Sequence, residues 1–378
     1  MRIIADANML FAKECFAGFG ELTLVPGREI IRDSIKSADA LLVRSITPIT
    51  AELLEGSSVK FIGTATSGTD HVDVGYLLDR GIQFADAKGC NANAVVDYCF
   101  AGLAYHQMIR EIEARDSKVG IVGYGHVGSL FARRLAALGI DTVISDPPLQ
   151  SVATERVSRD MFKSLQEIAR CPVISLHVPL TTTTDFPTQN LIEADFLSAL
   201  PEQALLMNTC RGSVVNEQDL FELLGQRQDL TCIVDVWENE PQIDSALAAR
   251  VAIATPHIAG YSVEAKCSAT FQLLDSFCDY FELSPTTLPE ANLINKEEIA
   301  DSCLIENDAW ATLLNCLPIR QISAEFKSSI TQRGIDKAFD EFRSKLMARR
   351  EFRSLRTAAS RFSEQQRNIL VAQGISLA

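Results

Sequence analysis

The strongest constraint on the fold of this chain is a glycine-rich turn between a strand-like run and a helix-like run. The run at residues 118–122 is KVGIV, the turn at residues 123–128 is GYGHVG, and residues 126–138 continue with helical spacing. In such a turn the first glycine permits the tight bend, the second lets backbone approach a bound phosphate, and the third lets the helix pack closely on the strand. The amino-terminal end of the helix then faces the phosphates. The sequence therefore predicts a strand, turn and helix that bind a dinucleotide.

Strand-like and helix-like runs alternate on both sides of this turn. We expect further strands at residues 1–6, 40–43, 60–63, 82–85, 141–145, 173–177, 204–208, 231–236 and 251–254. Long helices are expected at residues 92–114 and 263–283. Strands that alternate with helices form parallel sheets through right-handed crossovers, so we expect an α/β fold with doubly wound parallel sheets. The run SPTTLP at residues 284–289 interrupts the pattern and leads into a C-terminal region of roughly ninety residues.

Composition and charge argue against several classes of function. The 378 residues are 47% hydrophobic and 22% charged, which is typical of a globular protein with two or three domains. A formal net charge of −14 argues against general binding to nucleic acid or to an anionic membrane surface. The ten cysteines are scattered, without a C-x-x-C pair and without metal-like pairing with the five histidines. Without a signal peptide or an apolar run of ~18 residues, we expect a soluble cytoplasmic protein that holds no metal.

The residue after the next predicted strand indicates which dinucleotide is bound. Asp146 lies 18 residues after Gly128, at the end of the strand predicted at 141–145. Its carboxylate can accept hydrogen bonds from both hydroxyls of a ribose, and its charge would repel a 2′-phosphate. Pro147 and Pro148 follow, so no adjacent arginine is available to bind that phosphate. The sequence favours NAD over NADP.

Three short segments further along supply a cation, a carboxylate and an imidazole. Arg211 follows a predicted strand within NTCRG, Glu240 precedes a proline beyond the next strand, and His257 ends the segment TPH. Each of these residues also has an ordinary, non-catalytic interpretation. Arg211 could be a surface arginine, Glu240 a solvated loop acid and His257 a structural histidine. The guanidinium fork suits a carboxylate or a carbonyl that gains negative charge, and a neighbouring carboxylate stabilises an imidazolium. Together they are the groups needed to move a hydride and a proton to or from an alcohol beside a carboxylate.

With the glycine turn, these segments resemble the D-isomer-specific 2-hydroxyacid dehydrogenase family over about residues 1–285. The resemblance implies a Rossmann-type NAD domain and a flavodoxin-like substrate domain. It implies that His257 is the general acid and base, that Glu240 hydrogen-bonds it, and that Arg211 holds and polarises the substrate. It also implies cofactor contacts at Gly123, Gly125, His126, Val127, Gly128, Asp146, Val178, Thr209, Cys210, Asp235 and Gly260.

The amino-terminal half narrows this resemblance to a subfamily whose substrate carries a phosphate. The motifs are VRSITP at residues 43–48, GTATSGTDHVD at 63–73, GCNANAV at 89–95 and HIAGY at 257–261. These motifs contain backbone N–H groups, hydroxyls and a guanidinium. Such groups can bind the carboxylate, the hydroxyls and the phosphate of a substrate. The alternative role of the Ser45 and Thr66 hydroxyls is ordinary turn or strand-end capping. The alternative for Tyr261 is a half-buried core ring. The candidate substrate residues are Arg44, Ser45, Thr66, Ser67, Gly68 and Tyr261.

We expect three domains and a homodimer. The domains are a discontinuous substrate-binding domain at 1–95 with 262–284, an NAD-binding Rossmann domain at 96–261, and a smaller C-terminal α+β dimerisation domain at 285–378. Residues Ile335, Phe339, Phe342 and Leu346 form an apolar helical stripe, and residues 343–367 carry eight Lys or Arg against two acids. The basic residues form either a solvated helix face or, as a sharper hypothesis, a site where the partner's Arg349 or the partner's Arg350 pairs with the substrate phosphate.

Two alternatives share the fold and the cofactor. A dehydrogenase of D-3-phosphoglycerate would act on a substrate with the same three functional groups, although a recognisable regulatory βαββαβ tail is missing from this sequence. An NAD-binding corepressor of the same fold would use dimerisation and peptide binding, and it could keep all three catalytic residues. The polar and basic groups of the amino-terminal half favour the enzyme over the corepressor. An enzyme that oxidises a small phosphorylated 2-hydroxy acid is therefore the predicted function.

Overall fold

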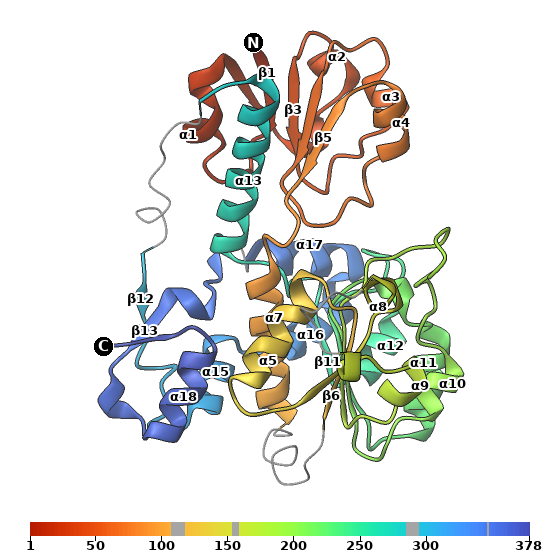
Figure 1. Cartoon of the computed structure of the whole chain (residues 1–378), viewed down its shortest axis with the longest axis vertical. Coiled ribbons are helices and arrows are strands. Elements are labelled where there is room, and N and C mark those ends of the chain that lie inside the picture. Colours follow the sequence, from red (N-terminus) through yellow and green to blue (C-terminus); the bar gives the residue numbers. More distant parts are fainter. Residues whose placement is uncertain (107–117, 153–158, 285–294, 346–347) are drawn as a thin grey trace. The chain divides into compact units, whose positions relative to one another are not determined.

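The computed structural model describes residues 1–106, 118–152, 159–284, 295–345 and 348–378. These residues form two compact units (Figure 1). Unit 1 comprises Met1–Asn91 with Ser262–Asn295, and unit 2 comprises Ala92–Tyr261 with Lys296–Ala378. The predicted α/β class with parallel sheets is confirmed, since every strand pair in both units is parallel.

Unit 1 is built on a five-stranded parallel sheet in the order β2-β1-β3-β4-β5. Its strands are β1 (Arg2–Asp6), β2 (Glu21–Val25), β3 (Ala40–Val43), β4 (Phe61–Thr64) and β5 (Gln83–Asp86). Its helices are α1 (Ala12–Phe16), α2 (Arg32–Ile35), α3 (Ala51–Leu54), α4 (Val74–Asp79) and α13 (Val263–Phe281). Strands β3 and β4 are buried along their whole length, as expected for central strands covered on both faces.

The long helix α13 follows residues 92–261 of unit 2 in the sequence, and it covers one face of the unit 1 sheet (Figure 1). It begins where the Ser262 hydroxyl accepts a hydrogen bond from the Ala265 N–H, an ordinary amino-terminal cap. Its Phe277 ring packs edge-on against Phe16 at 5.4 Å and Phe61 at 5.6 Å between centroids. Burying a side chain of this size contributes about 1.5–3 kcal/mol, so these contacts account for why residues 262–295 join unit 1.

Unit 2 is built on a six-stranded parallel sheet in the order β11-β10-β9-β8-β6-β7. Its strands are β6 (Val119–Val122), β7 (Thr142–Ser145), β8 (Val173–Leu176), β9 (Leu205–Asn208), β10 (Thr231–Val234) and β11 (Ile253–Ala254). Its helices up to residue 250 are α5 (Ala92–His106), α7 (His126–Ala136), α8 (Pro147–Ser151), α9 (Leu165–Ile168), α10 (Ala194–Ser198), α11 (Glu217–Gln226) and α12 (Ser245–Arg250). The strand order reverses between β6 and β8, and the crevice at such a point is where open α/β sheets bind ligands.

The described residues of the C-terminal region add helices and a small parallel sheet to unit 2. The helices are α15 (Ala309–Cys316), α16 (Ile319–Arg333), α17 (Ile335–Lys345) and α18 (Glu364–Ala372), and the strands are β12 (Glu297–Glu298), β13 (Leu355–Thr357) and β14 (Ser376–Leu377). Helix α16 covers the edge strand β11, where the Ser323 hydroxyl accepts the N–H of Ala254 at 2.9 Å. An edge strand covered in this way is protected from pairing with another chain. The predicted role of residues 285–378 as a dimerisation domain stays a prediction.

A buried aspartate of helix α5 bonds both to helix α7 and to the C-terminal region. Asp97 is fully buried, its Oδ1 accepts a hydrogen bond from Arg134 at 2.6 Å, and its Oδ2 accepts the N–H of Phe352 at 2.8 Å. Burial raises the pKa of Asp97, against the lowering effect of Arg134 and Arg349. Removing either charge of the Asp97–Arg134 pair would leave the other one buried without its partner, and the Phe352 N–H adds a hydrogen bond from the C-terminal region to the same carboxylate.

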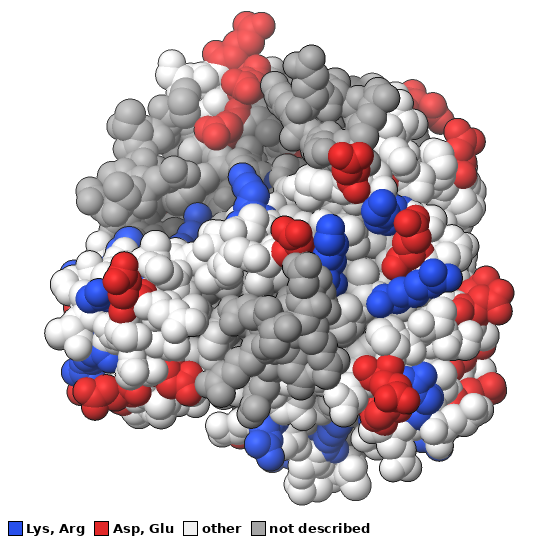
Figure 2. All heavy atoms as spheres, turned by 60° about the horizontal axis from the view of Figure 1, so that its bottom comes forward, with Lys and Arg blue, Asp and Glu red and all other residues white. Residues whose placement is uncertain are grey.

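Parts of the sequence predictions fall on residues that the structure does not describe. The predicted helix at 92–114 is observed as α5 up to His106, and its last residues lie outside the described part. Leu346 of the apolar stripe also lies outside it, whereas Phe339 and Phe342 are buried as predicted. None of the described helices is both long and apolar enough to span a bilayer. On the face shown in Figure 2, basic side chains lie beside acidic ones.

Candidate active site

The glycine turn between β6 and α7 has the geometry that the sequence predicts. Gly123 has φ +90°, and a side chain there would lie 2.6 Å from the carbonyl oxygen of His177. A side chain at Gly128 would lie 2.0 Å from the carbonyl oxygen of Gly123, so only glycine lets the helix pack this closely on the strand. A side chain at Gly125 would meet nothing within 4 Å, which leaves open space at the amino-terminal end of α7. These residues fit the pyrophosphate of a dinucleotide.

Asp146 lies beside this turn and performs a second task. Its Oδ2 accepts the N–H of Tyr124 at 2.8 Å, which joins the end of β7 to the glycine turn. Its Oδ1 accepts the N–H of Leu149 at 2.9 Å and caps α8, whose first residues are the two prolines. Each carboxylate oxygen has a second lone pair for a ribose hydroxyl. The sequence predicted the ribose contact but not the capping role.

All predicted cofactor residues lie at one edge of the unit 2 sheet, because parallel strands all end on the same side. The turn follows β6, and Val178 contacts it, since a side chain at Gly123 would lie 2.8 Å from a Val178 methyl group. The others follow β7, β8, β9, β10 and β11 in turn, in the order Asp146, Val178, Thr209 and Cys210, Asp235 and Gly260. His177, next to Val178, is half-buried, and desolvation of its ring lowers its pKa to about 3, so it is neutral.

Two loops at this edge approach each other closely and carry Arg211 and Glu240. A side chain at Gly212 would lie 1.8 Å from the carbonyl carbon of Trp237, so glycine is needed where the two loops meet. The Asn208 amide donates to the Arg211 carbonyl at 3.0 Å and shapes the loop after β9. Arg211 Nη1 donates to the carbonyl of Cys210 at 2.7 Å, which orients the guanidinium.

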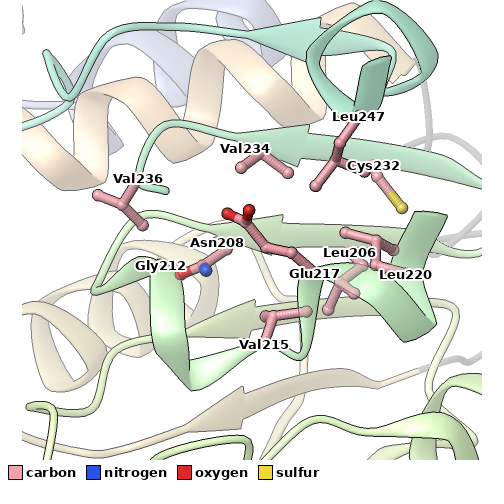
Figure 3. Close-up of a pocket in the computed structure, with 10 residues that line it drawn as sticks. All are labelled: Leu206, Asn208, Gly212, Val215, Glu217, Leu220, Cys232, Val234, Val236 and Leu247. Carbon is pink, nitrogen blue, oxygen red and sulfur yellow. The ribbon is translucent and has the colours of Figure 1, made fainter. Parts of the chain in front are cut away.

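A small cavity of about 10 Å³ lies behind this contact, lined mainly by apolar side chains (Figure 3). The carboxyl group of Glu217 enters it from α11, at the same end as Asn208 and Gly212. Glu217 Oε1 accepts the N–H of Glu238 at 2.8 Å, in the loop that carries Glu240. Burial, followed by the charges of nearby acids, raises the pKa of Glu217 to about 7. No motif in the sequence singles out this acid.

The predicted catalytic pair is formed. His257 Nδ1 and Glu240 Oε2 are 2.7 Å apart, and Glu240 Oε1 accepts the N–H of Trp237 at 2.9 Å. Burial acts to raise the pKa of Glu240, but the charge and hydrogen bond of His257 outweigh it, so the pKa is lowered. A carboxylate beside Nδ1 fixes the tautomer with the proton on Nδ1 and leaves Nε2 for a substrate.

His257 has an unusual backbone conformation that its neighbours stabilise. Its φ is +55°, a region that non-glycine residues rarely adopt and that is often found at functional sites. Asp235 is fully buried and accepts hydrogen bonds from the Thr255 hydroxyl and from the N–H groups of Ile258 and Ala259, at 2.6, 2.8 and 2.9 Å. Asp235 therefore anchors the loop after His257, a role that sequence reasoning missed.

The C-terminal region also reaches this loop. Arg349 donates to the carbonyls of Ala259 at 2.9 Å, Ile258 at 3.3 Å and Ala94 at 2.6 Å. These bonds tie Arg349 to its own chain, and the hypothesis that the partner's Arg349 reaches the substrate stays a prediction. Arg350 forms an ion pair with Glu297. Arg343 donates to the Tyr261 hydroxyl at 2.7 Å. Only the basic character of residues 343–367 could have indicated these contacts from the sequence.

The candidate substrate residues of unit 1 lie at the carboxyl ends of β3 and β4. Arg44 Nε donates to the buried carboxylate of Asp6 at 2.9 Å, which holds the guanidinium at the end of β3. The Thr66 hydroxyl donates to the Gly68 carbonyl at 2.9 Å, and the Ser67 hydroxyl accepts the N–H of Gly89 at 3.3 Å. These bonds shape the loop after β4. Ser45 follows Arg44, whereas Tyr261 belongs to unit 2.

Lys266 of α13 is a further cation of unit 1 that sequence reasoning missed. Burial, together with the positive charge of Arg44, lowers its pKa to about 8. Two cations that influence each other in this way suit a ligand of high negative charge. Its position in the first turn of a long amphipathic helix gave no sequence signal.

The dinucleotide turn and the histidine, glutamate and arginine at one sheet edge define an NAD-dependent dehydrogenase. The family model described as "D-isomer specific 2-hydroxyacid dehydrogenase, NAD binding domain" matches residues 95–259. The chain belongs to this family and, within it, to the erythronate-4-phosphate dehydrogenases. It is 39% identical over 382 residues to the enzyme of that name from Pseudomonas syringae pv. tomato, with 99% of both chains covered. It is 38% identical over 360 residues to the one from Yersinia enterocolitica, with 94% of both chains covered.

The solved structures agree with the fold. A 3-phosphoglycerate dehydrogenase from Entamoeba histolytica, solved with NAD⁺ bound, has a TM-score of 0.59 and 26% identity. The likeness covers 75% of this chain and 95% of that one. The family resemblance and the NAD cofactor that the sequence predicts are thereby confirmed.

Proposed function

We propose that the protein oxidises 4-phospho-D-erythronate at C2 to 2-oxo-3-hydroxy-4-phosphobutanoate with NAD, a step of pyridoxal 5′-phosphate biosynthesis. The observation that carries this proposal is the 2.7 Å contact between His257 and Glu240, at the sheet edge that also carries Arg211. The likeness to erythronate-4-phosphate dehydrogenases over nearly the whole chain supports the choice of substrate, as do the amino-terminal motifs.

The chain's own groups suit the proton chemistry of this oxidation. His257 Nε2 accepts the proton of the C2 hydroxyl, and the Glu240 carboxylate stabilises the imidazolium that forms. Arg211 holds the substrate and polarises the oxygen at C2. A bound nicotinamide would supply the hydride acceptor for this oxidation, in which the C–H bond at C2 is replaced by the second bond of the C=O group. In the reverse direction His257 returns its proton to the alkoxide.

We assign the substrate contacts to Arg44, Ser45, Thr66, Ser67, Gly68 and Tyr261. The ion pair with Asp6 holds the Arg44 guanidinium in place, while the Thr66 hydroxyl and the Gly68 carbonyl stabilise the loop after β4. A loop held by its own hydrogen bonds can present further N–H groups to a carboxylate at little entropic cost. Lys266, beside Arg44, adds positive charge to the same edge of unit 1.

We further propose that the enzyme is a cytoplasmic homodimer with the three predicted domains. The substrate-binding domain is 1–95 with 262–284, the NAD-binding domain is 96–261, and the dimerisation domain is 285–378. The scattered cysteines, eight of the ten buried, suit a reducing compartment. Size-exclusion chromatography with light scattering tests the dimer, since a monomeric full-length chain would contradict it.

A substrate panel tests the proposed function. NADH formation is followed with 4-phospho-D-erythronate, D-3-phosphoglycerate and unphosphorylated D-2-hydroxy acids at equal concentrations. We expect the highest kcat/KM with 4-phospho-D-erythronate. A preference for 3-phosphoglycerate would favour the first alternative, and inactivity with all of them, despite tight NAD binding, would favour the corepressor.

A further inference from the structure

Arg343 belongs to the C-terminal region yet lies at the catalytic loop of the same chain. Its Nε donates to the Tyr261 hydroxyl at 2.7 Å, four residues beyond His257. Its guanidinium carbon lies 5.1 Å from the centroid of the Tyr261 ring and 5.7 Å from that of Phe339. Aromatic rings within about 6 Å stabilise a guanidinium through cation–π attraction. The side chain is therefore held between two rings and a hydroxyl.

Helix α17, which carries Arg343, is itself fixed to unit 2. Phe339 and Phe342 are buried and pack edge-on against Phe326 of α16, at 6.2 and 5.8 Å between centroids. At the other end of the helix, the Gln242 amide bonds to the Asp336 carboxylate and joins α17 to the loop after Glu240. The position of Arg343 thus follows from packing and hydrogen bonds on both sides of it.

The donors of this guanidinium are only partly used. Among the described residues, Arg343 Nη1 and Nη2 form neither a hydrogen bond nor an ion pair, and the side chain is half-buried. Its positive charge reaches Glu240 and contributes to lowering the pKa of that carboxyl. Glu240 is already committed to His257 and to the Trp237 N–H. A cation with two available nitrogens therefore lies near the group that must become an imidazolium.

The positive charge of Arg343 in this position needs a nearby anion to balance it. A positive charge close to His257 disfavours the imidazolium that forms during oxidation, unless a negative charge compensates it. The proposed substrate has two anionic groups. Its phosphate, with about −1.5 to −2 charges, carries more negative charge than its carboxylate and is therefore the group better able to compensate Arg343. A planar guanidinium with two parallel donors matches the geometry of a phosphate.

We propose that Arg343, oriented by Tyr261 and Phe339, binds the terminal phosphate of the substrate from within the same chain. This inference rests on the proposed function, because it takes the phosphorylated acid as the substrate. It differs from the hypothesis for the partner's Arg349, since Arg349 is bonded to carbonyls of its own chain. It makes the C-terminal region part of the substrate site.

The test compares 4-phospho-D-erythronate with D-erythronate in Arg343→Gln and Arg343→Lys. We expect Arg343→Gln to raise KM for the phosphorylated substrate at least ~10-fold, and to lower kcat/KM at least ~10-fold more for it than for D-erythronate. Arg343→Lys keeps the positive charge but not the planar pair of donors, so its loss in kcat/KM should be intermediate. Competitive inhibition by inorganic phosphate should weaken in parallel.

Arg333→Gln is the matched control, because Arg333 lies on the neighbouring helix α16 and pairs with Glu341. It should leave both substrates unaffected, and unchanged NAD affinity and melting temperature in each Arg343 variant show that the fold is intact. An unchanged KM in Arg343→Gln, or an equal loss with both substrates, would overturn the inference. A wild-type enzyme without preference for the phosphorylated acid would instead overturn the proposed function, so the two failures are distinguishable.

Discussion

Asp235 and Arg349 both bond to the backbone of the same two residues, Ile258 and Ala259. Asp235 accepts the N–H groups of Ile258 and Ala259, and Arg349 donates to the carbonyl oxygens of these residues. His257 directly precedes them and has φ +55°. A backbone conformation of this kind persists only where its surroundings determine it. The C-terminal region therefore helps to position His257, the proposed base.

The first prediction concerns Arg349. Arg349→Met should lower kcat at least ~10-fold and reduce the free energy of unfolding by about 2–3 kcal/mol, since hydrogen bonds to a charged group are lost. Arg349→Lys should recover part of both. Turnover and thermal unfolding measure these effects, with Arg361→Met as a control because both Arg361 and its partner Asp301 are exposed. A stable Arg349→Met with normal kcat would show that Asp235 alone positions the loop.

The second prediction concerns the pH dependence of oxidation. Because the pKa of Glu240 is lowered, its carboxylate is ionised at working pH and favours the protonated form of His257. In Glu240→Gln the neutral amide no longer stabilises the positive charge of the imidazolium. The acid limb of kcat/KM for 4-phospho-D-erythronate should therefore move to lower pH. An unmoved acid limb would mean that Glu240 is not the functional partner.

The third prediction concerns Glu217, whose pKa is raised to about 7 from 4.5. Between these values the folded protein holds a proton that the unfolded chain has released, so this group makes stability fall as pH rises from 4.5 to 7. The loss is on the order of 1–2 kcal/mol after allowance for solvent screening. Glu217→Gln keeps an acceptor for the Glu238 N–H and should raise the melting temperature at pH 8 more than at pH 5. Equal changes at both pH values would contradict a neutral Glu217.

The fourth prediction separates the two tasks of Asp146. Asp146→Ser keeps an oxygen that can cap α8 but removes the charge that repels a 2′-phosphate. Its kcat/KM with NAD should fall and its ratio of NAD to NADP use should approach one, while its melting temperature stays near that of the wild type. Asp146→Ala should show the same change in cofactor preference. It should also have a lower melting temperature, because the lost cap reduces the free energy of unfolding by about 1 kcal/mol. A wild type that uses both cofactors equally would contradict this assignment.

The sequence predicted the central strands and the local motifs well because their signals are local. Buried strands such as β3 read as continuous apolar runs, and the glycine turn has a fixed spacing. Edge strand β2 was missed, since it is largely exposed and its residues form no such run. The strands β12 and β14 have two residues each, too few for any periodicity.

The site shows the same difference between features with a local sequence signal and features that depend on tertiary packing. His257 and Glu240 were predicted because each stands in a recognisable short motif, and their contact is formed. Arg343 and Arg349 were not assigned to the catalytic loop of their own chain, because they lie more than 80 residues from it in sequence and reach it only through tertiary packing. Glu217 was missed because its raised pKa depends on burial, which no motif encodes.

The central claim, that His257 is the base of a dehydrogenase acting on 4-phospho-D-erythronate, is tested most directly by one kinetic comparison. NADH formation from this substrate is measured for the wild type and for His257→Ala, with NAD affinity determined in parallel by fluorescence. The account predicts that the substitution lowers kcat by about 10²–10⁴ while NAD affinity stays within a few fold. A His257→Ala variant that oxidises the substrate at a near-normal rate would contradict it.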